Sequence, residues 1–120
     1  MENILKNSLE IISVMEKEKL SVREFMRQNS EFFEPVMTSS LIAPECLNSD
    51  IYKESGYIFL IGSYIYFKSE GKPVTWFERR RFAKFEENRF EKVFRKTLCS
   101  NATRRFGCLK ELKETIKSLC

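Results

Sequence analysis

The sequence predicts a single α+β domain over residues 1–120, with N-terminal helices, a small central antiparallel sheet over about 56–78 and two C-terminal helices. Three observations predict this class. Apolar residues recur at helical spacing near both ends of the chain. The run "YIFLIGSYIYF" at 57–67 is rich in β-branched and aromatic residues, as strands are. A length of 120 residues with 42% hydrophobic residues suits one domain with its own core.

The first expected helix spans residues 3–19. Its apolar residues share one broad side of a helical projection: Ile4, Leu5, Leu9, Ile11, Ile12 and Met15. Its polar residues share the other: Lys6, Glu10, Ser13 and Lys17. This division is typical of an amphipathic helix that packs on a core.

A capping box predicts where the second helix begins. In "LSVREF" at 20–25, Ser21 precedes Glu24 by three residues, so each side chain can satisfy a backbone donor of the other. The helix should therefore start at about Val22. It should end by Glu34, because Pro35 disfavours helical geometry in the residue before it.

Residues 36–55 predict less regular structure. A short helix could open at Ser39 or Ser40, or at Pro44 as a first-turn residue. The sequence "NSD" at 48–50 is then typical of a turn.

The central sheet is expected to consist of short strands joined by tight turns. Gly62 and Ser63 suit a two-residue hairpin between "YIFLI" and "YIYFK", and Gly71 suits a turn that needs positive φ. Residues 73–77 would form a third strand, which Pro73 restricts to a strand start or a sheet edge. The alternative is one long strand over 56–68 paired with 73–80.

A helix from about Arg79 to Cys99 is predicted to hide aromatic residues and to show basic ones. Its apolar arc comprises Phe82, Phe85, Phe90, Val93, Phe94, Thr97 and Leu98. The opposite side carries Arg81, Lys84, Asn88, Lys92 and Arg95. A final helix should run from Thr103 or Cys108 to the end of the chain. Because aromatic and basic residues do not alternate with a period of two, a base-stacking sheet is disfavoured.

The net charge of +4 is unevenly distributed. Residues 1–70 carry 7 basic and 11 acidic side chains, whereas residues 71–105 carry 11 basic and 4 acidic ones. The first part therefore has a net charge of −4 and the second of +7. This asymmetry favours a polyanion or an acidic protein surface as a partner, although basic residues can also serve only to solubilise a helix.

These observations predict a small, non-catalytic regulatory protein that binds nucleic-acid backbone. The expected contact residues are Arg79, Arg80, Arg81, Lys84, Lys92, Arg95, Arg104 and Arg105. The alternative is a protein-directed inhibitor or adaptor, of the anti-defence or immunity type found in phages and mobile elements. Its basic side would dock on an acidic or nucleic-acid-binding groove of a partner protein.

Several other functions are disfavoured by what the sequence lacks. The chain has no histidine and no recognisable nucleophile or phosphate-loop motif, so an enzyme is not expected. Four widely spaced cysteines without a C-x-x-C pair do not predict a zinc site, and no cofactor is expected. A winged helix would place its recognition helix in residues 36–50, which contain no Lys or Arg. Without a secretory signal or a long apolar run, the protein is expected in the cytoplasm, or in the nucleus of a eukaryotic host.

Overall fold

The fold is all-helical across the residues that the computed structural model describes, which are 2–33, 41–72, 74 and 90–120. The α-helices are α1 (Glu2–Lys17), α2 (Val22–Gln28), α3 (Ser30–Phe33), α4 (Glu54–Glu70), α6 (Glu91–Thr97) and α7 (Leu109–Leu119). Two single-turn 3₁₀ helices, η2 and η3, span Pro44–Cys46 and Ala102–Arg104. No strand occurs among the described residues. The predicted α+β class is therefore wrong.

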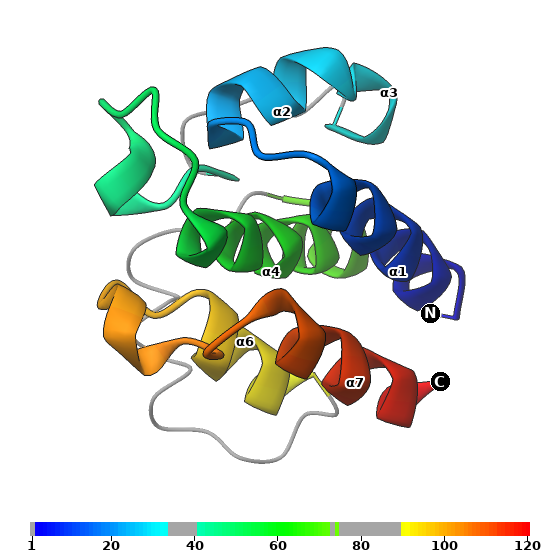
Figure 1. Ribbon diagram of the computed structural model, residues 1–120. Helices are drawn as coiled ribbons and strands as arrows, with labels where there is room; N and C mark the ends of the chain where they lie inside the picture. The colour runs from blue at the N-terminus through cyan, green and yellow to red at the C-terminus, as the bar shows by residue number, and fades with distance from the viewer. Residues whose placement is uncertain (1, 34–40, 73, 75–89) are drawn as a thin grey trace.

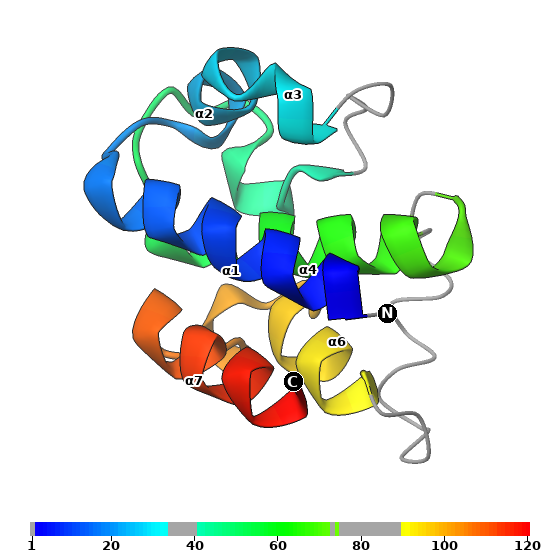
Figure 2. The same cartoon turned by 90° about the vertical axis from the view of Figure 1, so that its right-hand side faces the viewer.

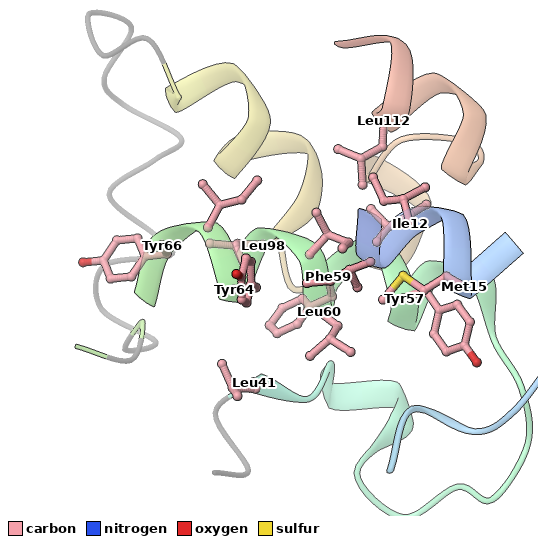
Figure 3. Packing of buried hydrophobic residues seen from close by; sticks show 14 of the residues in the cluster. Ile12, Met15, Leu41, Tyr57, Phe59, Leu60, Tyr64, Tyr66, Leu98 and Leu112 are labelled. Atoms are coloured by element: carbon pink, nitrogen blue, oxygen red, sulfur yellow. The ribbon is translucent and has the colours of Figure 1, made fainter. Parts of the chain in front are cut away.

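Helix α4 lies at the centre of the molecule. Figure 1 shows α2 and α3 above it and α6 and α7 below it, and Figure 2 shows α1 running alongside it. Every residue from Gly56 to Tyr66 is buried. In Figure 3, Leu112 of α7 and Leu41 lie on opposite sides of α4, with Ile12 and Met15 of α1 near one end. The helix is thus covered on all sides.

The predicted sheet over 56–78 is wrong, because residues Glu54–Glu70 form helix α4. A helix that is buried on every side has no polar face, and this one was mistaken for strands. Its sequence lacks the 3.6-residue period, and a short apolar run cannot be assigned to strand or helix from periodicity alone. The abundance of Ile, Tyr and Phe then favoured the strand interpretation. Val74 is buried but is not in a strand, and the rest of the third strand predicted over 73–77, or over 73–80, lies outside the described residues.

Gly62 marks a close helix contact rather than a hairpin turn. A Cβ built on Gly62 would lie 2.0 Å from Thr97 Oγ1 and 2.6 Å from Thr97 Cβ. The backbone of α4 can approach α6 this closely only because residue 62 has no side chain. Gly71 does take positive φ, at 75°, but as the C-cap of α4, where its N–H donates to the Phe67 carbonyl.

Helix α1 and the start of helix α2 agree with the predictions from the sequence. Helix α1 buries Leu5, Ile11 and other apolar residues of the predicted face. Helix α2 begins at Val22, and the Ser21 hydroxyl accepts a hydrogen bond of 3.2 Å from the Glu24 N–H, which confirms half of the capping box. The Glu24 carboxylate accepts hydrogen bonds from Arg27 and Gln28. The predicted single helix is divided in two, because α2 ends at Gln28 with Asn29 as its C-cap and α3 begins at Ser30. The predicted end at Glu34, before Pro35, lies outside the described residues.

The remaining boundaries resolve two alternatives. Pro44 opens η2 as a first-turn residue, whereas Ser39 and Ser40 lie outside the described residues. The last helix begins at Leu109 with Cys108 as its N-cap, so the later of the two predicted starts is confirmed. Among the described residues, no helix has the length and apolar character needed to span a membrane.

Candidate functional site

Helix α6 separates an aromatic side from a basic side. Phe90, the N-cap, and Phe94 are each 2% exposed, and the Val93 and Thr97 side chains are fully buried. The Phe94 ring meets the Tyr66 ring of α4 edge-on, with centroids 5.5 Å apart. The predicted apolar arc is therefore confirmed where the structure describes it, from Phe90 to Leu98.

The other arc residues, Phe82 and Phe85, lie outside the described residues. So do four of the predicted contact residues, Arg79, Arg80, Arg81 and Lys84.

Three basic residues at helical spacing form the side of α6 opposite its buried residues. Lys92, Arg95 and Lys96, here called the α6 basic face, are separated by three and four positions and so share one side of the helix. Lys92 is exposed, and Arg95 and Lys96 are partly exposed. Only Lys92 and Arg95 of this group were predicted as contacts.

Carboxylates neutralise part of this face. An Arg95 guanidinium nitrogen lies 3.6 Å from Glu91 Oε2, and Lys96 Nζ lies 3.7 Å from Glu111 Oε1 of α7. Lys96 Nζ also lies 5.1 Å from the centroid of the Phe106 ring. Lys92 is thus the member of the face whose charge is least offset, since no ion pair involves it within the described part of the chain.

The connector between α6 and α7, residues 98–108, carries the last two predicted contacts. Arg104 is exposed on η3, whose N-cap Asn101 accepts a hydrogen bond of 3.0 Å from the Thr103 N–H. The Phe106 N–H donates to the Lys96 carbonyl at 2.9 Å, so the end of the connector folds back against the end of α6. Arg104 and the α6 basic face therefore belong to one compact part of the molecule.

Arg105 lies inside the protein. Its side chain has no exposed surface, and its guanidinium pairs with both carboxylate oxygens of Glu45. Arg105 Nε also donates to the Cys99 carbonyl at 2.9 Å, and the guanidinium nitrogens donate to the carbonyls of Ser55 at 3.1 Å and Ser100 at 3.4 Å. All five N–H donors of the guanidinium are used within the protein, so none is left to bind phosphate. Arg105 is therefore removed from the predicted phosphate contacts.

Sequence reasoning had no means to separate Arg104 from Arg105. Glu45 lies 60 positions before Arg105, so no local pattern indicates the pair. The Arg105 guanidinium carbon also lies 4.9 Å from the centroid of the Phe59 ring. Phe59 belongs to a segment that was predicted to be a strand. Only the tertiary structure identifies Arg105 as an interior residue.

The Glu45 carboxylate is held in its charged form. Burial alone would raise its pKa, but the hydrogen bonds and positive charge of Arg105, together with a hydrogen bond from Ser55 at 2.9 Å, outweigh burial and lower it. Nearby Cys46 has a raised thiol pKa, because it is buried and lies beside the Glu45 charge. The thiol therefore remains protonated at neutral pH, which is unfavourable for nucleophilic chemistry.

The ionisable groups that the structure describes show no metal-binding arrangement. All four cysteines are free. Across residues 2–33, 41–72, 74 and 90–120, no group of three or more Cys, Asp or Glu side chains converges as metal ligands would.

A comparison with protein families, with curated proteins and with solved structures finds no match to this chain.

Proposed function

We propose that the protein is a non-catalytic regulatory binding protein that engages the phosphate backbone of nucleic acid through the α6 basic face and Arg104. The observation that supports this is the division of α6 into a buried aromatic side and an outward basic side. A helix anchored in this way presents its cations at fixed positions, and most of the entropy cost of ordering its backbone is met on folding.

The proposed contacts differ in how available their charges are. Lys92 and Arg104 are exposed and would meet phosphate directly. Arg95 and Lys96 now face Glu91 and Glu111, so their contribution is partly offset. Arg79, Arg80, Arg81 and Lys84 precede α6 in the sequence and remain predicted contacts on the basis of charge alone.

A salt titration of binding tests the proposal. The parent protein is titrated against a short fluorescent duplex and its single strand, starting at low salt because non-specific affinity is micromolar or weaker at physiological salt. Each phosphate contact on duplex should contribute about −0.9 to the slope of log K against log[salt]. A Lys92→Ala, Arg104→Ala variant should then have a slope shallower by about 1.8, twice that contribution.

A matched control separates contact from net charge. Lys6→Ala, Lys17→Ala removes the same two charges from exposed positions on α1. This control should keep the parent slope. Equal slopes for the parent, the control and the Lys92, Arg104 variant would contradict the proposed surface.

The alternative is the protein-directed inhibitor or adaptor. It would use the same cations, so the charge distribution does not separate the two, and the nucleic-acid titration does. If the parent fails to bind duplex and single strand at low salt, the nucleic-acid proposal is wrong and the protein-directed function becomes the one to pursue. For either function we expect the protein to act in the cytoplasm.

A further inference from the structure

We infer that Arg105 is a positioning residue for the proposed surface: it fixes the α6–α7 connector so that its neighbour Arg104 is held where it can meet phosphate. The inference rests on the proposed function. It assigns two adjacent arginines, which the sequence presents as equivalent, to opposite roles. One contacts the ligand, and the other orders the backbone that carries it.

The first step is the bonding of Arg105 to its own connector. Its side chain donates to the Cys99 carbonyl at 2.9 Å and to the Ser100 carbonyl at 3.4 Å, both of which precede it in the chain. The Arg105 N–H donates to the Ala102 carbonyl at 3.2 Å. The loop from 99 to 105 is therefore closed on itself around one guanidinium.

The second step is the attachment of this loop to the rest of the fold. The same guanidinium binds Glu45 of η2 and the Ser55 carbonyl in the first turn of α4, and it lies over the Phe59 ring. Both η2 and the start of α4 are distant in sequence from the connector, and both belong to the packed core. Arg105 thus fixes the connector to η2 and α4 from inside.

The third step is what this does to Arg104. Its N–H donates to the Asn101 carbonyl at 3.0 Å, so its backbone belongs to the η3 turn that Arg105 closes. The Arg104 side chain itself is exposed. Fixing the backbone holds Arg104 at the place on the surface from which it reaches phosphate, and a loosened connector would carry Arg104 away from that place, so that the contact is lost.

Lysine cannot replace Arg105 in this role. The guanidinium offers five N–H donors in a planar fork, and here they serve four acceptor residues: Glu45, Ser55, Cys99 and Ser100. An ammonium group has three donors at a single point. The substitution Arg105→Lys therefore keeps the charge and loosens the connector.

A double-mutant cycle on the salt slope tests the inference. Arg104→Ala should make the slope on duplex shallower by about 0.9, the contribution of one contact. Arg105→Lys should produce the same change although no charge is lost. The double variant should match Arg104→Ala alone, because both changes remove the same contact. Lys92→Ala combined with Arg105→Lys should instead be additive, with a slope shallower by about 1.8.

A purely structural role for Arg105 gives a different result. Arg105→Lys would then lower the melting temperature and leave the slope of the folded protein at the parent value. If that slope is unchanged while Arg104→Ala flattens it, the inference is wrong and the proposed function stands. If the parent does not bind nucleic acid at low salt, both fail together.

A second variant guards against misfolding of Arg105→Lys. Glu45→Asp keeps every charge and withdraws the partner carboxylate by one methylene. It should flatten the slope in the same direction, and again without effect in the Arg104→Ala background. An unchanged slope in Glu45→Asp, with the carboxylate contact shown by NMR to be weakened, would overturn the inference.

Discussion

Helices α4 and α6 pack against each other and show two ways in which a helix can serve a small protein. α4 is buried on every side from Gly56 to Tyr66, so it contributes stability and has no free surface over those residues. α6 buries one side and leaves basic residues on the other. The comparison teaches that, of these two elements, only α6 can meet a ligand without unfolding the core.

The largest expected effect concerns the buried side of α6. Phe90 is 2% exposed and packs near Phe94, with ring centroids 6.1 Å apart. Phe90→Ala should lower the free energy of unfolding by about 3–5 kcal/mol, because it removes a large side chain from a packed core. Chemical denaturation measures this. An unchanged denaturation midpoint would mean that α6 is not anchored by its aromatic side, and the contrast drawn between α4 and α6 would be wrong.

A smaller effect is expected where the two helices touch. Gly62→Ala places a Cβ 2.0 Å from Thr97 Oγ1, so the helices must separate, at a cost of about 1–3 kcal/mol. At an open helical site the same change would be favourable by about 1 kcal/mol. The sign of the change in unfolding free energy therefore tests the close approach directly.

Gly71 gives the matched control. A Cβ there meets nothing within 4 Å, but its φ of 75° is strained for alanine. Gly71→Ala should cost about 1–2 kcal/mol, from backbone strain alone. A Thr97→Ala change, which removes the Oγ1 atom nearest to the added Cβ, should partly relieve Gly62→Ala and leave Gly71→Ala unaffected.

Ser63 tests the burial of α4 from within the helix. Its hydroxyl is fully buried and has no hydrogen-bond partner within the described part of the chain. Ser63→Ala should therefore leave stability unchanged or raise it by up to about 1 kcal/mol, since an unsatisfied buried hydroxyl is unfavourable. A clear loss in a thermal melt would indicate a partner for this hydroxyl.

The smallest expected effect is the acid dependence of the Glu45–Arg105 pair, because the Glu45 side chain remains 23% exposed. The folded pKa of Glu45 lies below its ordinary value of 4.5, so the pair stabilises the protein above that pH and its contribution is lost as pH falls through the folded pKa. The unfolding free energy of the parent relative to Glu45→Gln should be constant above pH 4.5 and should shrink below it. A difference that stays the same at all pH values would contradict the pairing.

The sequence predicted the amphipathic helices well and the interior helix badly, for one physical reason. Helices α1, α6 and α7 each have a polar side, so their apolar residues recur with a readable period. The Ser21 cap is likewise a local interaction within one helical turn. Helix α4 has no polar side, and its identity depends on neighbours that are distant in sequence.

The same distinction applies to the candidate site. Charge at Lys92 and its exposure could be inferred from helical spacing alone. Burial of Arg105 could not, because its partners Glu45 and Ser55 belong to segments 60 and 50 positions away. Partial neutralisation of Lys96 by Glu111 likewise arises only when α7 packs beside α6.

The proposed binding surface is tested most directly by NMR. Backbone amide shifts of the parent protein are followed during titration with a short duplex at low salt. We expect the largest changes in residues 91–97 of α6 and 100–104 of the connector, with little change in the buried part of α4, and we expect added salt to reverse them. Changes concentrated on α1 or α2, or the absence of any salt-reversible change, would contradict the account.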